Sequence, residues 1–252
     1  MIPLINLDHE FGQIRVYRKK QSGEIVYLQD GYYQSRCDSA GISVVTYVHA
    51  LYDFVLQTKA KKVLMIGCGG GTLGYMLART GIEVTIADVN PAAIAIAKNF
   101  FNLPATVECF PADGADYLAA STNKFDAVIL DAYCGSTIPE HFCTADFFKL
   151  VRSRLCGPNG GFFANVQVAD DEDEAALRFA AAAGAVWSCV RILDWPGAIY
   201  RNAIIAGGGV EALTAPTLTL KPLSLSESIS RELRQLRFID DTIQYRGEAD
   251  CE

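Results

Sequence analysis

The sequence predicts an α/β fold in which helices cover both faces of a mainly parallel sheet. From residue 62 onward, apolar strand-like runs alternate with helical patterns, and the first of these strands leads through a glycine cluster directly into a helix. Parallel β-α-β crossovers are right-handed and bring the carboxyl ends of the strands to one edge. Ligands of such sheets bind outside that edge, so we expect the functional residues there.

The first forty residues are predicted to form a small β subdomain. Residues 13–18 and 24–29 alternate apolar and polar side chains, and the segment between them has turn composition and includes Gly23. This pattern indicates a β-hairpin within a small N-terminal sheet over residues 1–40. Residues 42–58 are apolar at helical spacing and lead into the first core strand.

The central region, residues 41–206, carries the repeated β-α units. Its predicted strands are 62–66, 83–88, 105–109, 125–131, 160–167, 186–193 and 199–206. Its predicted helices are 72–80, 91–100, 114–120, 144–155 and 171–184. The last two strands are joined by the short turn 194–197, so they are expected to pair as an antiparallel hairpin. A parallel sheet that ends in such a hairpin indicates the Rossmann-like fold of class I S-adenosylmethionine methyltransferases.

The last region, residues 207–252, is predicted to begin with a surface linker. Residues 207–224 are rich in Gly, Thr, Pro and Ser, and a helix is predicted over 225–236. The final segment, 247–252, is expected to be disordered.

Composition excludes several classes of function. The chain of 252 residues has a formal net charge of −7, which argues against a nucleic-acid partner and suits a cationic substrate. It contains no apolar run of about 18 residues, so we expect no membrane span. The N-terminal residues lack the basic and apolar regions of a signal peptide.

The cysteines and histidines favour a cytoplasmic protein without a metal. Eight cysteines are scattered with no C-x-x-C spacing, which is typical of buried thiols in a reducing compartment. The three histidines, His9, His49 and His141, are too dispersed to predict a metal site.

The glycine cluster after the first core strand predicts a nucleoside site. Glycine allows a tight turn and a close approach to a ligand, and the cluster consists of Gly67, Gly69, Gly70 and Gly71. The next strand ends at Asp88, an acid at the distance that suits the two hydroxyls of a ribose. No Gly-Lys-Ser/Thr follows, and the third position of the dinucleotide pattern is Thr72. A single nucleoside without a pyrophosphate is therefore the better interpretation.

Two further aspartates fall at predicted strand ends. Asp113, followed by Gly114, is interpreted as a group that accepts a hydrogen bond from an adenine amino group, or else as an N-cap of helix 114–120. Asp131 faces the same crevice, where it orients an amine or accepts a proton, or else caps the loop that follows. The acidic run 170–174 is interpreted as the first turn of a helix, with attraction of a polyamine as the alternative.

Over residues 9–206 the chain resembles the spermidine synthase family of polyamine aminopropyltransferases. The hairpin segment Leu28-Gln-Asp-Gly-Tyr-Tyr-Gln34 is similar to the family's L-D-G-x-x-Q, which plain methyltransferases lack. The other matching segments are Gly67–Leu73, Asp88-Val-Asn-Pro91, Asp113-Gly114, Asp131 and Ile138–Phe148.

The resemblance implies a role for each matching polar residue. Gln34 and Asp88 would contact the ribose or sulfonium side of the donor. Asp113 would bind adenine, and Asp131 would line the amine pocket. The donor is expected to be decarboxylated S-adenosylmethionine or S-adenosylmethionine, and the acceptor a small amine.

The chain also departs from the family pattern in its amine-binding residues. The glycine run of the family contains an aspartate, whereas Gly67-Cys-Gly-Gly-Gly71 has none. The second aspartate of the family's D-S-T-D-P is replaced by Cys134, and a neutral thiol is a poor partner for an ammonium. The family's Y-H-E run is absent, although Tyr47 and His49 lie nearby.

Three functions remain open from the sequence. In an aminopropyltransferase, Asp131 would be the base and Tyr133 would position the amine. A methyltransferase on the same scaffold is the second hypothesis, and a non-catalytic nucleoside-binding protein is the third. The free edge of the N-terminal hairpin offers a way to form a homodimer.

Overall fold

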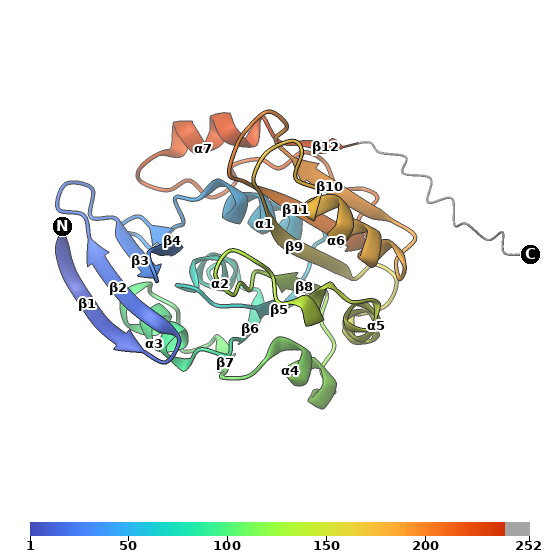
Figure 1. Cartoon of the computed structure of the whole chain (residues 1–252), viewed down its shortest axis with the longest axis horizontal. Coiled ribbons are helices and arrows are strands. Elements are labelled where there is room, and N and C mark those ends of the chain that lie inside the picture. The colour runs from blue at the N-terminus through green and yellow to red at the C-terminus, as the bar shows by residue number, and fades with distance from the viewer. Residues whose placement is uncertain (240–252) are drawn as a thin grey trace, which may run out of the picture.

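The computed structural model describes residues 1–239, which form two sheets and the helices packed on them (Figure 1). The expected tail, 247–252, lies outside the described residues. The strands are Ile2–His9 (β1), Gly12–Arg18 (β2), Ile25–Gln29 (β3), Tyr32–Cys37 (β4), Lys62–Ile66 (β5), Glu83–Ala87 (β6), Glu108–Phe110 (β7), Ala127–Leu130 (β8), Gly161–Val168 (β9), Val190–Asp194 (β10), Arg201–Gly208 (β11) and Arg237–Ile239 (β12). The helices are Thr46–Gln57 (α1), Thr72–Ala78 (α2), Pro91–Phe100 (α3), Gly114–Ala120 (α4), Ala145–Arg154 (α5), Ala175–Gly184 (α6) and Ser226–Leu233 (α7), with a 3₁₀ turn at Glu140–Cys143.

The larger sheet confirms the predicted α/β fold. Its strand order is β12-β10-β11-β9-β8-β5-β6-β7. The pairs between β9, β8, β5, β6 and β7 are parallel, whereas β10 and β11 form the predicted antiparallel hairpin. The β5 strand, which leads into the glycine turn, thus lies inside the sheet, with β8 on one side and β6 on the other.

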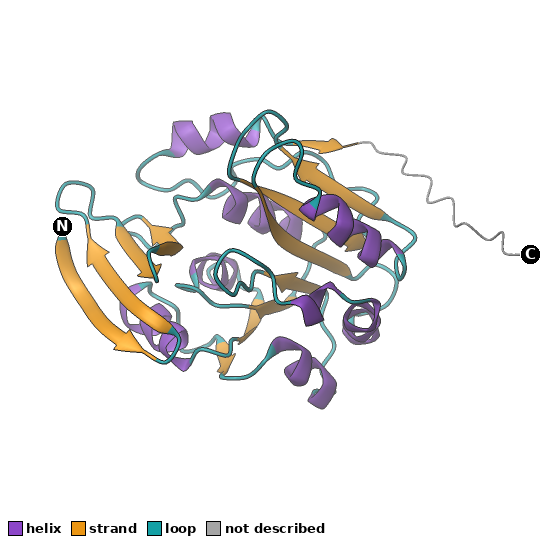
Figure 2. Ribbon diagram, viewed as in Figure 1, coloured by secondary structure: helices purple, strands orange, loops and turns teal. Residues whose placement is uncertain are grey.

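Side chains of each inner strand alternate between two hydrophobic cores. Val63 and Met65 of β5 pack into the core under α1, α2 and α3, and Leu64 and Ile66 pack into the core under α4, α5 and α6. Because successive residues of a strand point to opposite faces, an unbroken apolar run fills both cores. Helices consequently cover both faces of the sheet (Figure 2).

The N-terminal sheet is larger than the predicted hairpin. It has four antiparallel strands in the order β1-β2-β3-β4, so the sequence-based prediction missed β1 and β4. Asp30 and Gly31 join β3 to β4, and both have positive φ angles, 50° and 85°. Two residues with positive φ make the type I′ turn that suits the twist of a β-hairpin. This turn sets Gln34 on β4.

The acidic run before α6 is not helical, contrary to the prediction. The predicted helix 171–184 begins only at Ala175. Residues 170–174 form a loop in which Asp170 and Asp173 accept backbone N–H groups of the loop itself. Aspartate side chains that bind nearby backbone groups compete with helix formation, which explains the later start.

No helix within residues 1–239 combines the length and the apolar character that a membrane crossing needs.

Candidate active site

A cavity of about 1020 Å³ opens at the carboxyl ends of the parallel strands. Its walls come from β4, the glycine turn after β5, the start of α1, the loop after β8 and the adjoining ends of β9 and β11. Four predicted site residues line it, namely Gln34, Gly69, Asp131 and Tyr133. The other six lie outside its lining, namely Gly67, Gly70, Gly71, Asp88, Asp113 and Gly114.

The glycine turn brings β4 and the end of β8 close to the start of α2. Gly67 has a φ of 97°, and a Cβ there would lie 2.1 Å from the main-chain oxygen of Asp131. A Cβ on Gly69 would lie 2.9 Å from the main-chain oxygen of Gln34. The hydroxyl of Ser35 accepts a 2.8 Å hydrogen bond from Gly70 N–H, and Gly71 is the N-cap of α2. These glycines therefore permit close approach of the protein's own backbone as well as of any ligand.

Asp88 holds the glycine turn through its carboxylate. Its two oxygens accept hydrogen bonds from the backbone N–H of Cys68, at 2.6 Å, and of Asn90, at 2.7 Å. Desolvation raises the pKa of Asp88, and these two hydrogen bonds oppose the rise because they stabilise the ionised form. Asp88 thus links the first two core strands at the edge where a ribose is expected.

Asp113 is the N-cap of α4. Its Oδ1 accepts hydrogen bonds from Ala115 N–H at 2.8 Å and Asp116 N–H at 3.3 Å, and its Oδ2 lies 3.0 Å from Nε2 of His141. A Cβ on Gly114 would lie 2.3 Å from Cγ2 of Ile66, so only glycine lets the helix start pack on the end of β5. An adenine amino group would share Oδ2 with His141.

Asp131 anchors a chain of polar side chains on the cavity floor. Its Oδ2 accepts a 3.1 Å hydrogen bond from the hydroxyl of Tyr47, and its Oδ1 accepts a 2.8 Å bond from the amide of Asn165. The amide of Asn202 in turn donates to Oδ1 of Asn165 at 2.9 Å. Desolvation raises the pKa of Asp131, and the two hydrogen bonds lower it.

The hydroxyl of Tyr133 is engaged with the backbone of β9. It donates to the main-chain oxygen of Asn165 at 2.7 Å and accepts from Gln167 N–H at 3.0 Å. Burial, and next the negative charge of Asp131, raise the pKa of this phenol. Tyr133 thus ties the loop after β8 to β9, and its ring lines the cavity.

The sequence-based reasoning missed Asn165 and Asn202 and left Tyr47 without a role. The one available signal was a polar residue, Asn165, within the otherwise apolar run 161–166. Asn165 is 2% exposed, and a buried amide needs hydrogen-bond partners. Asp131 and Asn202 are those partners, and they are 34 and 37 residues away in the sequence.

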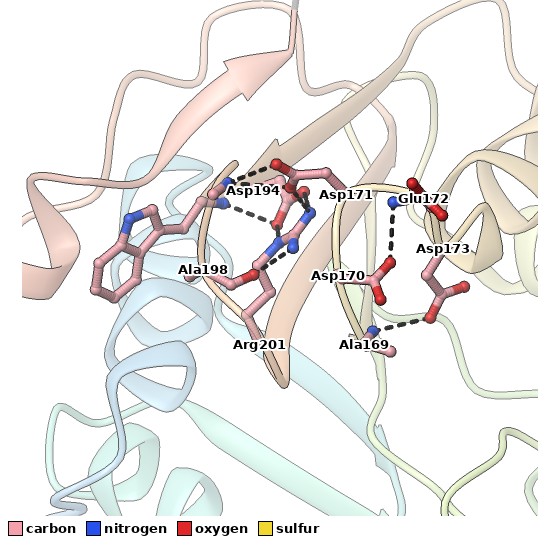
Figure 3. Close-up of polar contacts among 10 residues, drawn as sticks. Ala169, Asp170, Asp171, Glu172, Asp173, Asp194, Ala198 and Arg201 are labelled. Carbon is pink, nitrogen blue, oxygen red and sulfur yellow. Dashed lines mark hydrogen bonds and ion pairs between the residues drawn. The ribbon is translucent and has the colours of Figure 1, made fainter.

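An ion-pair cluster is centred on Arg201, a residue of the cavity lining (Figure 3). Arg201, which starts β11, binds both carboxylate oxygens of Asp194 at 2.8 and 2.9 Å. The same guanidinium lies 3.0 Å from Asp171 in the acidic loop, and Asp171 also accepts the N–H of Gly197 at 3.0 Å. The loop 169–173 is thereby fastened to the β10–β11 turn.

Within the part of the chain that the structure describes, no three His, Cys, Asp or Glu side chains gather as metal ligands would. Cys134 is exposed and pairs through its backbone with Thr137, and its side chain is not part of the cavity lining.

Sequence comparison relates the chain to two kinds of transferase. A family model described as a methyltransferase domain matches residues 63–153. A polyamine aminopropyltransferase of Chromobacterium violaceum is 34% identical over 129 residues, which are 48% of this chain and 49% of that protein. A ubiquinone biosynthesis O-methyltransferase of Rhizobium etli is 26% identical over 68% of each chain. The chain thus spans about half the length, or less, of the first aminopropyltransferase relatives that it matches.

The likeness in structure extends over nearly the whole chain. The crystal structure of a probable spermidine synthase from Corynebacterium glutamicum has a TM-score of 0.76 and 18% identity, with 93% of this chain and 89% of that one covered. At this identity the match demonstrates a shared fold, and it covers both the small N-terminal sheet and the methyltransferase-type domain. The chain is thus similar to polyamine aminopropyltransferases over about half of its sequence, and it shares the fold of a probable spermidine synthase.

Proposed function

We propose that the protein is a transferase that takes an aminopropyl group from decarboxylated S-adenosylmethionine and gives it to an amine held over Asp131. The observation that carries the proposal is the position of Asp131. Its desolvated carboxylate lies on the floor of a large cavity, and the glycine turn and Gln34 lie in the same cavity wall.

The contacts on the donor side support a nucleoside at the end of β5. Gly69 and Gln34 line the cavity there, and Asp88 fixes the turn through the N–H of Cys68. A carboxylate oxygen can accept more than one hydrogen bond, so Asp88 retains capacity for a ribose hydroxyl. Asp113 and Gly114 are proposed for the adenine end, where Oδ2 of Asp113 faces His141.

The reaction is a displacement at the carbon next to the sulfonium. The nitrogen lone pair of the acceptor forms the new C–N bond as the C–S bond breaks, and the electron pair leaves with sulfur in a neutral thioether nucleoside. The amine must be neutral to attack, and the carboxylate of Asp131 is proposed to take its proton. Tyr47 and Asn165 would hold that carboxylate in place.

Methyl transfer from S-adenosylmethionine is a second candidate, and one observation favours it. The cavity-lining residues of β4 and the glycine turn include no acid, whereas they do include Arg36. An aminopropyl ammonium would gain no carboxylate partner there, and a donor carboxylate would meet no repulsion. The matched O-methyltransferase relative is in keeping with this alternative.

The test is calorimetric titration with the two donors, followed by analysis of the nucleoside product. Tighter binding of decarboxylated S-adenosylmethionine, and amine-dependent formation of methylthioadenosine, would support aminopropyl transfer. Preference for S-adenosylmethionine, with formation of S-adenosylhomocysteine, would assign a methyltransferase. Binding of neither donor would favour the non-catalytic alternative.

A further inference from the structure

A second cavity of about 310 Å³ lies beside the candidate active site, between the start of α1, the β10–β11 turn and α7. We call it the side pocket, and its volume suits a small chemical group. The side pocket and the larger cavity share six lining residues, namely Arg36, Val45, Tyr47, Tyr200, Arg201 and Asn202. The two cavities thus have a common wall, and a ligand that extends along this wall would enter both.

The common wall lies on the acceptor side of the candidate site. The hydroxyl of Tyr47 donates to Asp131, and Asn202 is joined to Asp131 through Asn165. The glycine turn and Gln34, which are proposed for the donor, do not line the side pocket. A molecule whose amine meets Asp131 can therefore extend past Tyr47 into the side pocket, while the nucleoside would occupy the other end of the larger cavity.

Arg36 is the cation of the common wall that retains donors for a ligand. Within residues 1–239 its side chain makes one hydrogen bond, from Nε to Glu24 at 2.7 Å. Arg201, by contrast, binds Asp194 through Nε and Nη2, and the main-chain oxygen of Ala198 through Nη1. A guanidinium presents its N–H groups as a planar fork that matches a carboxylate. Nη1 and Nη2 of Arg36 are thus available to a carboxylate in the side pocket.

Glu232 of α7 is the anion of the side pocket. The hydroxyl of Thr46 donates to its Oε2, and the hydroxyl of Ser228 donates to its Oε1 at 3.1 Å. None of the ion pairs between residues of the described chain includes Glu232. A carboxylate oxygen can accept more than one hydrogen bond, so Glu232 can hold an ammonium in the same pocket as Arg36.

The rest of the side-pocket wall is largely apolar. Trp195, Val45 and Ile229 belong to it, and such surfaces exclude water from a bound ligand. Hydrogen bonds between charged groups are stronger where less water competes for them. A group with one carboxylate and one ammonium would find one available cation and one available anion in this pocket.

We infer that the side pocket binds the head of an α-amino acid, with the carboxylate on Arg36 and the α-ammonium on Glu232. The acceptor is then an α-amino acid whose side chain ends in the amine that meets Asp131. This second step rests on the proposed function, since it takes the acceptor to be an amine. S-adenosylmethionine also has an α-amino-acid head, but the side pocket adjoins the acceptor side and includes no residue of the glycine turn, which favours the acceptor as the source.

Three ligands of one chain length separate the contributions of the two charged groups. L-Ornithine carries both groups, 1,4-diaminobutane lacks the carboxylate, and 5-aminopentanoate lacks the α-ammonium. Each is titrated calorimetrically at pH 8 into the full chain with methylthioadenosine present. L-Ornithine is expected to bind at least about tenfold more tightly than either analogue. L-2,4-Diaminobutanoate and L-lysine, with analogues of matching length, extend the test to a shorter and a longer side chain.

Substitution of each charged residue should remove one of the two preferences. Arg36→Gln should abolish the preference for L-ornithine over 1,4-diaminobutane, and Glu232→Gln should abolish its preference over 5-aminopentanoate. Arg178→Gln removes a cation that lines only the larger cavity, and Glu227→Gln removes an exposed anion of α7 outside both linings. These two matched controls should keep both preferences. Each effect is a ratio of affinities within one variant, so a lower fraction of folded protein does not alter it.

Arg36→Lys keeps a cation beside Glu24 and provides the test if Arg36→Gln does not fold. It should lower the preference for L-ornithine over 1,4-diaminobutane several-fold, because an ammonium lacks the planar fork of a guanidinium. An unchanged preference in both Arg36 variants would overturn the inference, and so would equal affinity of the wild-type protein for amino acid and diamine at every chain length.

Titration of the same variants with the two donors identifies the source of the amino-acid head. A preference for S-adenosylmethionine over its decarboxylated form that disappears in Arg36→Gln would assign the side pocket to the donor and overturn the assignment to the acceptor. The proposed function has its own readout, the nucleoside product. Aminopropyl transfer to simple amines but to none of the amino acids would overturn the inference alone, whereas tight binding of the amino acids without aminopropyl transfer would overturn the proposed function alone.

Discussion

At the scale of single residues, Asp131 is the proposed catalytic base, and desolvation of its ionised carboxylate lowers the stability of the fold. Its carboxylate is desolvated, and only two neutral donors, Tyr47 and Asn165, compensate for the lost water. A carboxyl with a raised pKa in the folded state is stabilised when protonated. Its favourable contribution to folding is present below the ordinary value of 3.8 and is lost as the pH rises through the raised pKa.

Asp131→Asn is expected to lower turnover by about 10²-fold or more, because the attacking amine loses its base. Donor affinity should stay within about twofold, since the nucleoside contacts are elsewhere. The melting temperature at neutral pH should hold or rise, because the variant removes a desolvated charge. Steady-state kinetics, calorimetry and thermal melts measure the three quantities.

Asp146→Asn, at a site whose side chain is 90% exposed, is the matched control and should change none of them. Unchanged turnover in Asp131→Asn would remove Asp131 from the mechanism.

Gly67 has a positive φ and also has no room for a Cβ atom. The costs of these two features can be measured separately. Gly67→Ala would place a Cβ 2.1 Å from a main-chain oxygen, at a φ of 97°. Gly81→Ala has a similar φ of 79° but nothing within 4 Å of the added Cβ. We expect Gly81→Ala to cost about 1 kcal/mol of unfolding free energy and Gly67→Ala about 3 kcal/mol or more. Urea unfolding measures both, and equal losses would contradict the close approach of the turn to the end of β8.

At the scale of elements, the helices that were predicted correctly have recognisable capping residues in the sequence. Helices α3 and α4 were predicted at their observed bounds because each has a clear start, with Asn90 before Pro91 and Asp113 as caps. Strand β4 was missed although Asp30-Gly31 is a strong hairpin signal, because its own residues are mostly polar or aromatic and half exposed. The start of α6 was misplaced because the acidic side chains bind loop backbone instead of continuing the helix.

The site could be predicted only as far as strand ends can be recognised. Asp88, Asp113 and Asp131 each follow an apolar run, and that position was enough to select them. Asn165 and Asn202 depend on pairing between β9 and β11, whose register no local pattern reports. The ion-pair partner of Arg201 was equally hidden, because Asp171 lies in a distant segment of the chain.

Helix α1 contains a buried histidine that should make folding sensitive to acid. His49 is 1% exposed, its Nε2 lies 2.7 Å from the main-chain oxygen of Ser43, and burial lowers its pKa from 6.5. The unfolded chain then binds more protons than the folded one, so stability falls as the pH drops below about 6.5.

His49→Gln should flatten this dependence by up to about 1.4 kcal/mol per pH unit between pH 6.5 and 5, because glutamine does not titrate. Urea unfolding at a series of pH values measures the slope. An identical slope in the variant and the wild-type protein would show that His49 does not carry the effect, whatever the change in absolute stability.

At the scale of the whole molecule, the N-terminal sheet and the central domain share one hydrophobic core. Ile14, Val16 and Tyr27 of the small sheet belong to the same buried cluster as Phe54 of α1 and Met65 of β5. Helix α7 joins this cluster through Ile229 and Leu233, and it packs against α1. The position of β4 over the glycine turn thus depends on contacts throughout the fold.

The free edge of the small sheet leads to a last prediction, a homodimer formed by β1. Strand β1 is an edge strand with eight residues, and Ile2 and Leu7 on it are 44% and 39% exposed. Unpaired backbone groups along such an edge favour pairing with a second copy. Light scattering at micromolar concentration should give twice the monomer mass, and Leu7→Lys should shift it toward the monomer, because a lysine on an edge strand opposes pairing. Leu223→Lys, at a position 75% exposed and distant in sequence from the small sheet, should leave the mass unchanged. A monomeric mass for the wild-type protein, or equal effects of the two substitutions, would rule out the β1 edge as a dimer interface.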